Sequence, residues 1–455
     1  MPALPRVVIV GGGFSGSAVA RQLGSQASVT IVSLDNFLLF TPMLAEAAIG
    51  DVDPRHIVTP IRQLAPHAAL VQGEVVAIDT ERMAVTVQPV FGVGPVTVEG
   101  DVLVIALGSV PHTYGVDGVE EHALGFKGIS DALRVRNRVL ALLEGASLDR
   151  DPWLTKLAVV GAGYSGAELA AALGDFVREA SRRFYRDAPT PQVTLVDAVE
   201  RVTPALSESL SASAARALKS RGVKLALGSA VAEVTDRGVR LASGEVIEAA
   251  TVVWAAGIRP NPLVAEIGLP TVKGKLVVDG HMRAAPGVYA VGDAALVPSG
   301  RGQISPPTAQ FALRQGRYLG RHLLALQRGD GGVPEFAYGT KGELVSLGHR
   351  NAVGKVLGVP VSGLIGWFLW RTYYLMQLPT FLRKGRVALD WTLDMVFPPD
   401  VAWIPSSDLG PRSAIRDPRS ELDDRAELDD RAELDDRAEL DDRAEKNDRP
   451  PADSG

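Results

Sequence analysis

The sequence predicts an α/β fold with two separate β-α-β units and a third region of different composition. A buried strand, a glycine-rich turn and a helix follow one another at residues 7–24, and the same order returns at residues 157–173. Residues 331–404 differ, because they hold four of the six tryptophans beside a long apolar run. A chain of 455 residues is long enough for two or three domains.

Both units carry the glycine spacing G-x-G-x-x-G where the strand meets the helix. The first turn contains Gly11, Gly13 and Gly16, and the second contains Gly161, Gly163 and Gly166. In such a turn the first glycine allows the sharp bend, the second lets the backbone approach a pyrophosphate, and the third lets the helix pack on the strand. Free N–H groups of the helix then face the phosphates. One match could be an ordinary turn, but two matches predict two bound dinucleotides.

The end of the second strand in each unit is the usual position of a ribose-binding acid. In the second unit this residue is Asp197, whose charge favours NADH over NADPH because it would repel a 2′-phosphate, although Arg201 follows closely. In the first unit Ser33 occupies this position and Asp35 follows two residues later. Either side chain is therefore a candidate for the ribose contact.

Composition excludes several kinds of chemistry. The chain has no cysteine, which excludes disulfides, thiolate nucleophiles, cysteine-ligated zinc and cysteine-bound iron–sulfur clusters. Redox chemistry would therefore need an organic cofactor, and no metal site is predicted. No block of Lys and Arg with interleaved aromatic residues indicates nucleic-acid binding. The first residues lack the pattern of a signal peptide, so we expect a cytoplasmic protein.

Residues 405–455 are polar and contain four copies of ELDDRA at 421–444. Each copy carries three acids and one arginine, so the four copies contribute −8 to the net charge of −6, and the remainder carries about +2. Leucines spaced by six residues do not share one face of a helix with 3.6 residues per turn. We expect a solvated, disordered acidic tail.

With these features in place, residues 5–400 resemble the type II NADH:quinone oxidoreductases, which are single-subunit respiratory NADH dehydrogenases that pump no protons. Six stretches carry the resemblance: NFLLFTPMLAEAAIG (36–50), LVIALGSVPHTYGVDGVEEHALGFKGISDALRVRNRV (103–139), VVWAAGIRPNPL (252–263), VYAVGDAA (288–295), PPTAQFALRQG (306–316) and SLGHRNAVGKVLGVPVSGLIGWFLWRTYYL (346–375). One departure is Leu107, which stands where the family usually has Thr.

The resemblance implies a glutathione-reductase-like flavoprotein with two Rossmann-like dinucleotide-binding domains. Residues 1–118 and 271–330 would form the FAD-binding domain, and residues 119–270 would form the NADH-binding domain inserted into it. A C-terminal membrane-interface region would follow at residues 331–404. Hydride would pass from NADH to FAD, and electrons would pass on to a membrane quinone.

The resemblance also implies which residues contact the two cofactors. These are Gly11, Gly13, Phe14, Ser15, Gly16, Ser33, Asp35, Pro42, Gly108, Gly292, Asp293, Thr308 and Ala309, together with Gly161, Gly163, Tyr164, Ser165, Gly166, Asp197 and Gly257. Asp293 would hold the ribityl chain of FAD. Thr308 and Ala309 would present backbone N–H groups to the pyrimidine edge of the flavin, where negative charge develops on reduction.

Glu168 and Gln310 are the two predicted catalytic residues. Glu168 matches the family's glutamate at the NADH and quinone end of the flavin, where it would position nicotinamide and relay a proton. The alternative is an ordinary glutamate in a first helical turn, favoured by the helix dipole. Gln310 would lie beside the flavin ring and the quinone, and its alternative is a polar residue that caps an apolar helix.

No segment is long enough to span a membrane, because the uncharged run 356–370 falls short of about 20 residues. The stretch 364–386 nevertheless suits a membrane surface. It combines an apolar helical stripe with aromatic and basic side chains, namely Ile365, Phe368, Leu369, Thr372, Leu375 and Met376 with Trp367, Trp370, Tyr373, Tyr374, Arg371, Arg383, Lys384 and Arg386. The stripe could instead pack on its own domain or on a second copy in a homodimer. The resemblance favours peripheral attachment to the cytoplasmic side of the cell membrane.

Other flavoprotein classes share part of this pattern. Disulfide reductases and sulfide:quinone reductases need cysteines, which this chain lacks. A soluble ferredoxin-type reductase shares both glycine turns but lacks the apolar, aromatic C-terminal segment. A non-enzymatic NADH-sensing flavoprotein, with the acidic tail as a partner site, is a further alternative.

Overall fold

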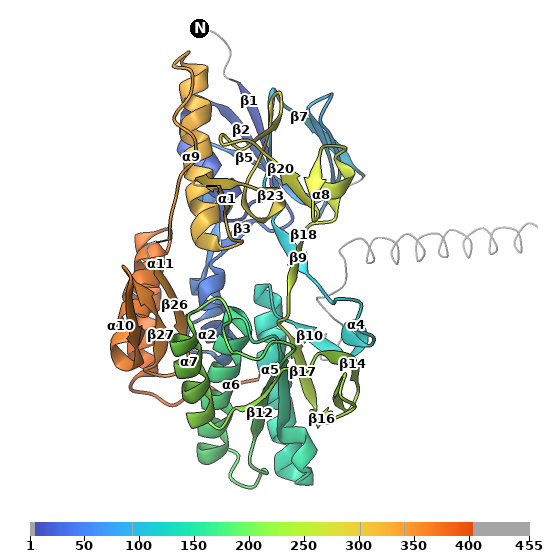
Figure 1. Cartoon of the computed structure of the whole chain (residues 1–455), viewed down its shortest axis with the longest axis vertical. Helices are drawn as coiled ribbons and strands as arrows, with labels where there is room; N and C mark the ends of the chain where they lie inside the picture. The colour runs from blue at the N-terminus through green and yellow to red at the C-terminus, as the bar shows by residue number, and fades with distance from the viewer. Residues whose placement is uncertain (1–4, 93, 301, 341, 404–455) are drawn as a thin grey trace, which may run out of the picture.

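The computed structural model describes residues 5–92, 94–300, 302–340 and 342–403. Two sheet-containing domains lie one above the other, and a C-terminal unit packs against the side of the lower one (Figure 1). This confirms the mixed α/β fold. The expected tail, residues 405–455, lies outside the described residues.

The first domain is built on a sheet in the order β21-β22-β8-β1-β2-β5-β6-β7. Its strands are β1 (Arg6–Val10), β2 (Ser28–Ser33), β5 (Ala69–Asp79), β6 (Ala84–Pro89), β7 (Val96–Glu99), β8 (Val102–Ile105), β21 (Arg283–Ala285) and β22 (Val288–Ala290). The central strands run parallel and are nearly continuous in apolar residues, as strands covered on both faces require. Helices α1 (Phe14–Leu23) and α9 (Ala309–Gln327) pack closely, because a Cβ on Gly316 would lie 2.2 Å from the Ser15 carbonyl oxygen.

The second domain has a parallel sheet in the order β10-β17-β11-β12-β13. Its strands are β10 (Ala123–Gly125), β11 (Lys156–Val160), β12 (Gln192–Asp197), β13 (Lys224–Leu227) and β17 (Thr251–Trp254). Helices α5 (Ile129–Asp149), α6 (Tyr164–Arg183) and α7 (Glu208–Ser220) accompany it. A small antiparallel sheet adds β14 (Val231–Thr235), β15 (Gly238–Leu241) and β16 (Val246–Glu248).

Two short antiparallel strands, β9 (Ser109–Pro111) and β18 (Ile258–Pro260), connect the two domains (Figure 1). After β18 the chain is already back in the first domain, because Val264 and Ile267 are buried in its core. Phe336 is buried in the same core. The structure therefore differs from the expected domain ends at 270 and 330, since these short apolar segments carry no periodicity that would assign them to one core.

The C-terminal unit contains an antiparallel sheet and two helices. The strands are β26 (Gly342–Ser346), β27 (Ala352–Val356) and β28 (Val359–Ser362), and the helices are α10 (Gly363–Gln377) and α11 (Phe381–Asp394). The helix α10 ends just before Pro379, and Thr380 caps α11 by accepting a hydrogen bond from the Arg383 N–H at 3.3 Å. Among the described residues, no helix combines the length and apolarity needed to cross a bilayer.

Three side chains that we expected at a membrane surface face the protein instead. Trp370 is only 1% exposed. Arg371 lies between the rings of Trp367 and Trp391, with its guanidinium carbon 4.1 and 4.7 Å from their centroids. Arg383 is buried and donates a hydrogen bond to the Arg55 carbonyl at 2.5 Å. The expectation was wrong for Trp370 and Arg371 because α11 covers one side of α10, and for Arg383 because this part of α11 packs on the segment at Arg55. The spacing within each helix reveals neither contact.

A short helix of the first domain's sequence, α2 (Leu44–Ile49), joins the parts of the molecule. All six of its residues are buried. They share one core with α5 and α6 of the second domain and with Trp370 and Trp391 of the C-terminal unit. The buried Arg136 of α5 donates hydrogen bonds to the carbonyl oxygens of Ile49, at 2.7 Å, and Asp400, at 2.6 Å.

Replacing this arginine tests the junction. Arg136→Met leaves the Ile49 and Asp400 carbonyls without their donor, so the free energy of unfolding should fall by about 1–3 kcal/mol. The measurement is thermal and urea unfolding of the variant beside the wild-type protein. Arg62→Met on the exposed face of α3 (Ile61–Leu64) is the matched control, with an expected change within about 0.5 kcal/mol. Equal stability of the two variants would contradict this role of Arg136.

Candidate functional site

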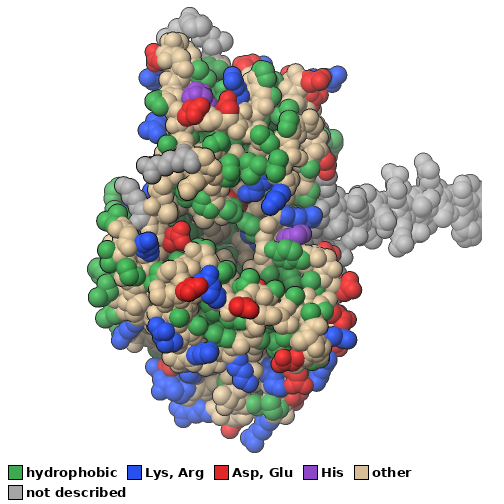
Figure 2. Space-filling view, in the orientation of Figure 1, with side chains coloured by type: hydrophobic (Ala, Val, Ile, Leu, Met, Phe, Trp, Pro, Cys, Tyr) green, Lys and Arg blue, Asp and Glu red, His purple; other side chains and the backbone are tan. Residues whose placement is uncertain are grey.

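A cavity of about 580 Å³ lies where the two domains meet. The molecular surface is hollowed at this level (Figure 2). The residues that follow β1, β2, β8, β17 and β22 line it, so the carboxyl ends of parallel strands from both sheets open into one space. Ligands of open α/β sheets bind beyond the carboxyl ends of the strands, and this volume is within the usual range of ligand sites. We call this cavity the cleft.

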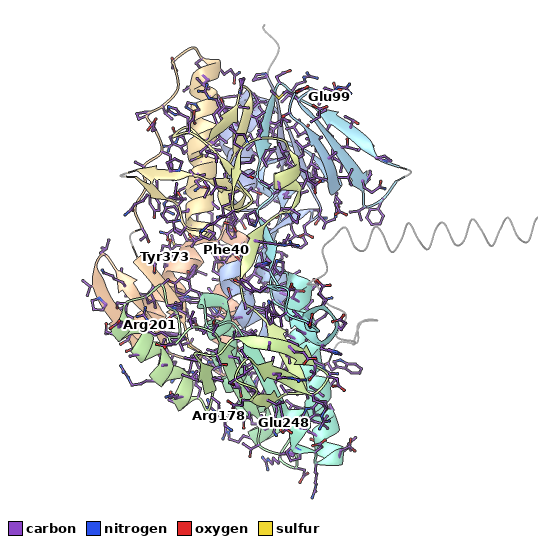
Figure 3. All side chains as sticks on the ribbon, turned by 45° about the vertical axis from the view of Figure 1, so that its right-hand side comes forward. Phe40, Glu99, Arg178, Arg201, Glu248 and Tyr373 are labelled. Atoms are coloured by element: carbon purple, nitrogen blue, oxygen red, sulfur yellow. The ribbon has the colours of Figure 1, made fainter. Side chains whose placement is uncertain are left out.

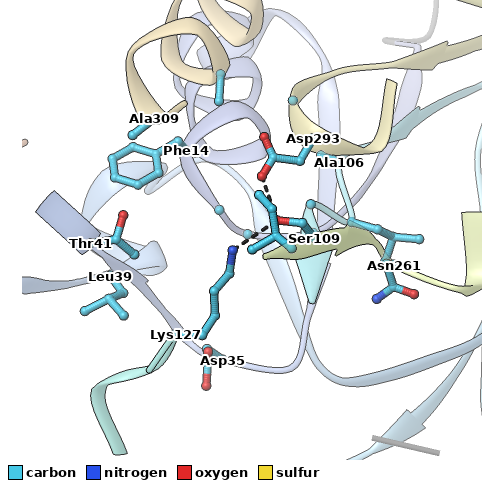
Figure 4. Close-up of a pocket in the computed structure, with 18 of the residues that line it drawn as sticks. Phe14, Asp35, Leu39, Thr41, Ala106, Ser109, Lys127, Asn261, Asp293 and Ala309 are labelled. Atoms are coloured by element: carbon cyan, nitrogen blue, oxygen red, sulfur yellow. Dashed lines mark hydrogen bonds between the residues drawn. The ribbon is translucent and has the colours of Figure 1, made fainter. Parts of the chain in front are cut away.

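Many of the predicted site residues line the cleft. They are Gly11, Gly13, Phe14, Ser15, Ser33, Asp35, Gly108, Ser165, Glu168, Gly257, Gly292, Asp293, Thr308 and Ala309. Both candidates for the first ribose contact, Ser33 and Asp35, are among them. Figure 4 shows how residues distant in sequence, such as Phe14, Lys127 and Asp293, surround the same space.

The first glycine turn fits a dinucleotide phosphate. Gly11 has φ +116°, and a Cβ there would lie 2.2 Å from the Ala106 carbonyl oxygen. A Cβ on Gly16 would lie 1.9 Å from the Gly11 carbonyl oxygen, so this residue must be glycine for α1 to approach β1. At Gly13 no atom of the described residues lies within 4 Å of such a Cβ. No side chain caps the start of α1, so its first N–H groups are available to an anion.

The second turn repeats this geometry. Gly161 has φ +112°, and a Cβ on Gly166 would lie 1.8 Å from the Gly161 carbonyl oxygen. In the part of the chain that the structure describes, nothing lies within 4 Å of the Cβ position of Gly163. No side chain caps the start of α6 either. The turn lies beside the cleft, and Ser165 and Glu168 of the same helix line the cleft itself.

Asp197 is held in place at the end of β12 by the backbone. Its carboxylate accepts hydrogen bonds from the N–H groups of Ala162, within the second glycine turn, and Val199, the latter at 3.0 Å. A carboxylate has about four acceptor positions, so Asp197 can still accept bonds from ribose hydroxyls. Arg201 is directed elsewhere, because it donates to the Pro204 carbonyl at 3.3 Å and lies 3.9 Å from Glu208.

A row of hydrogen bonds orients Asp293 in the cleft (Figure 4). The Ser109 hydroxyl donates to Asp293 Oδ2 at 2.7 Å, and Lys127 Nζ donates to Ser109 Oγ at 3.0 Å. Burial lowers the pKa of Lys127, and the charge of Asp293 opposes that shift. Ser109 and Lys127 were not among the site residues predicted from the sequence. The available signal was their position, directly after Gly108 and just before the start of α5.

The N-terminus of α9 also opens into the cleft. Thr308 caps this helix by accepting a hydrogen bond from the Phe311 N–H at 3.5 Å, and both Thr308 and Ala309 line the cleft. The partial positive charge of a helix N-terminus is therefore directed at the ligand space. Gln310 does not line the cleft, because its amide donates to the Tyr338 hydroxyl at 2.6 Å. Pro42 lines a different, smaller cavity.

Glu168 supplies a carboxyl group from α6 to the cleft. It lies in the second turn of α6 and accepts a hydrogen bond from the Ser346 N–H at 3.0 Å. Burial raises the pKa of Glu168 to about 8, because desolvation disfavours the carboxylate. The group therefore holds its proton at neutral pH, which suits an acid that donates a proton within the cleft.

The two open glycine positions give a matched test of the turns. Gly13→Ala should fold, since its Cβ meets no atom of the described residues, but should lose most bound FAD because the methyl group occupies the space through which the phosphate approaches the backbone. Gly163→Ala should keep FAD and raise the KM for NADH about tenfold, equivalent to about 1.4 kcal/mol. Flavin absorbance per chain and NADH titration measure the two effects. The same effect of both variants on FAD content would contradict the assignment of separate sites.

Comparison with known proteins places this site in a family. Residues 5–316 match the pyridine nucleotide-disulphide oxidoreductase family. The type II NADH:quinone oxidoreductase Ndh of Mycobacterium tuberculosis is 30% identical over 419 residues, covering 86% of this chain and 88% of that protein. A probable NADH dehydrogenase of Dictyostelium discoideum is 29% identical over 412 residues, covering 87% and 91%.

A solved structure shows the same fold. The NDH2 of Plasmodium falciparum, determined in complex with NADH, has a TM-score of 0.81 at 18% identity, covering 88% of this chain and 99% of that one. The fold agrees with the sequence relatives over nearly the same part of the chain. The chain therefore belongs to the pyridine nucleotide-disulphide oxidoreductase family and, within it, to the type II NADH:quinone oxidoreductases.

Proposed function

We propose that the cleft binds FAD at the first glycine turn and NADH at the second, and that this chain oxidises NADH and reduces a membrane quinone. The observation that carries the proposal is the convergence of elements from both domains on one cavity: the N-termini of α1 and α9 from one side and Ser165 and Glu168 of α6 from the other. FAD, when bound, accepts a hydride from NADH and passes two electrons on to the quinone.

The residues of the chain supply binding, orientation and a proton. The open backbone at Gly13 and Gly163 admits the pyrophosphates, and Asp197 accepts the ribose hydroxyls of NADH. Ser109 and Lys127 hold Asp293 toward the ribityl chain. Holding both dinucleotides in one cavity replaces a bimolecular encounter by a fixed geometry.

A row of aromatic rings leads from the cleft to α10 and supports access of a quinone from that side. Phe14 lines the cleft and lies 5.9 Å from Phe40, centroid to centroid, and Phe40 lies 6.2 Å from Tyr374. Tyr373 is 5.2 Å from Tyr374. Figure 3 shows Phe40 and Tyr373 near the junction of the upper and lower halves. An apolar quinone ring would pass along these side chains into the cleft.

The C-terminal unit exposes an apolar face that suits a membrane surface. It consists of Leu364, Ile365, Phe368 and Met376 of α10, Phe381, Leu382, Leu389 and Leu393 of α11, and the following Met395, Val396, Phe397 and Trp403. Apolar side chains gather along this edge of the molecule (Figure 2). Large contiguous patches of this kind mark interaction sites, and Lys384 and Arg386 can meet anionic headgroups. We propose peripheral attachment through this face, without a membrane span.

The alternatives make different demands on this face. A ferredoxin-type reductase would receive a soluble protein partner, whose docking relies on complementary charge rather than on an exposed apolar face. The face thus favours a quinone dissolved in lipid as the electron acceptor. A non-enzymatic NADH sensor would need the NADH site but no route to an acceptor.

Anaerobic stopped-flow absorbance tests the function. NADH should bleach the flavin of the purified protein, and a short-chain quinone should then restore the oxidised spectrum rapidly. Bleaching without any response to quinone would contradict the proposed function and favour a protein acceptor or a sensor. NADPH serves as the comparison substrate, and it should bleach the flavin more slowly because Asp197 would repel its 2′-phosphate.

The pKa of Glu168 gives a pH dependence. A carboxyl group with a pKa raised to about 8 is protonated below that pH and ionised above it, so kcat with quinone should fall as the pH rises above 8. Glu168→Gln should lower kcat about 10- to 100-fold and remove this limb of the profile. Steady-state rates between pH 6 and 9.5 provide the measurement. If Glu168→Gln keeps the wild-type fall in kcat above pH 8, a group other than Glu168 causes that fall.

Membrane attachment is tested by charge on the apolar face. Phe381 is 90% exposed, so Phe381→Glu should fold normally but weaken binding to vesicles containing anionic lipid about tenfold. Phe91→Glu, at an equally exposed loop position of the first domain (86%), is the control and should bind like the wild type. Flotation with vesicles measures binding. If Phe381→Glu instead splits a dimer and leaves vesicle binding intact, the face binds a second copy.

A further inference from the structure

Glu168 lines a second cavity in addition to the cleft. This cavity has a volume of about 20 Å³, and Glu46, Asp51, His349 and Arg371 line it as well. The volume is enough for about one water molecule, and the polar lining offers it several hydrogen-bond partners. Glu168 is therefore connected to a group of buried polar side chains on its other side.

These side chains come from segments far apart in sequence. Glu46 is on α2, and its Oε2 accepts a hydrogen bond from the Trp391 indole N–H at 3.0 Å. Asp51 follows α2, and Asp394 ends α11. One carboxylate oxygen of Asp51, one of Asp394 and one ring nitrogen of His349 all lie within 4.8 Å of one another.

One member of the group reaches solvent. The side chain of His349 is 48% exposed, whereas those of Asp51 and Asp394 are each 12% exposed. Its Nε2 lies 3.9 Å from Asp51 Oδ2, and its Nδ1 lies 3.7 Å from Asp394 Oδ2. Polar groups thus extend from the surface at His349, through Asp51 and Asp394, to Glu46 and the small cavity beside Glu168.

We propose that His349, Asp394, Asp51 and Glu46 form a proton-uptake route that reprotonates Glu168 during quinone reduction. The inference rests on the proposed function, because only reduction of a quinone requires this proton. The hydride taken from NADH carries two electrons and one proton, whereas a quinol has gained two electrons and two protons. The balance is NADH, one proton and quinone giving NAD⁺ and quinol, so one proton per turnover comes from water.

The acids of the route can carry protons near neutral pH. Burial raises the pKa of Glu46 to about 7, and the charge of Arg371 opposes this shift. Burial also raises the pKa of Asp51 well above its usual range, and that of Asp394 in the same direction. Proton transfer between neighbouring groups is efficient when their pKa values are similar, which holds for Glu46 and Glu168.

Other charged side chains lie near the route, but none of those described below substitutes for one of its four members. Arg371 lies 3.9 Å from Asp394 and supplies the positive charge that faces the acids. Arg350 lies near Arg371, and Arg136 lies near Asp51. Asp175 of α6 also lines the small cavity. It is engaged by the guanidinium groups of Arg178 and Arg221 and by the backbone N–H of His349 at 2.8 Å, so three of its about four acceptor positions are already used.

The test compares acceptors that differ in their need for protons. A short-chain quinone takes up two electrons and two protons, whereas ferricyanide takes up one electron and no proton. Glu46→Gln and Asp394→Asn should keep the NADH:ferricyanide rate within about twofold of the wild type and lose about tenfold in quinone turnover at pH 8. The loss should shrink at pH 6, where protons are more abundant.

The control is a carboxyl group one turn away on the same helix. Asp390 of α11 is similarly buried, but it lies 2.6 Å from His56, outside the group of Asp51, Asp394 and His349, and it does not line the small cavity. Asp390→Asn should therefore leave quinone turnover unchanged. A second readout is infrared absorption without NADH: the band of protonated carboxyl groups should titrate near pH 7 in the wild type and in Asp390→Asn, and should lose this component in Glu46→Gln.

The possible outcomes distinguish a failure of the proton-uptake route from a failure of the proposed quinone reduction. If the wild type reduces quinone and both route variants match it at every pH, the route is wrong and the function stands. If the wild type reduces ferricyanide but no quinone, the proposed function fails and the route fails with it. A variant that loses both acceptor activities equally has lost structure, and if both variants do so the route is overturned.

Discussion

The burial of α2 is the constraint on which the rest of the structure depends. This helix follows the first nucleotide-binding unit in sequence but packs between α5 and α6 of the second domain and the tryptophans of the C-terminal unit. Its five apolar side chains share one core with the second domain and the C-terminal unit, and its Glu46 accepts a hydrogen bond from Trp391, so this segment of the first domain's sequence is anchored in the other two parts. The cleft therefore has walls whose relative positions are set by close packing rather than by the short β9 and β18 connection.

The same burial also determines the electrostatics of the site. Glu46 and Glu168 lie next to this core, where desolvation favours their neutral forms and raises their pKa values toward neutrality. Lys127 responds in the opposite direction, with a lowered pKa, for the same reason. The interior thus keeps acids protonated and ready to donate, and Arg371 limits how much negative charge gathers there.

Local sequence patterns were sufficient for parts of the chain that depend on local geometry. The glycine turns at Gly11 and Gly161 adopt the positive φ values that their spacing predicts, and the strand after them in each unit pairs in parallel as expected. The Gly–Asp pair at 292–293 lies in the cleft with the first turn, although almost 280 residues separate them. A turn next to a parallel strand is recognisable because its steric requirement involves only neighbouring residues.

The sequence by itself determined the α/β class, the two nucleotide-binding turns, the absence of cysteine chemistry and a part of the residues that line the cleft. Only the tertiary structure decided that Trp370 and Arg371 face inward, that Gln310 binds Tyr338, and that Ser109 and Lys127 support Asp293. It also decided that Glu46, Asp51, His349 and Asp394 lie together. The physical reason is that a single sequence records spacing along the chain, whereas burial and charge pairing depend on contacts between segments hundreds of residues apart.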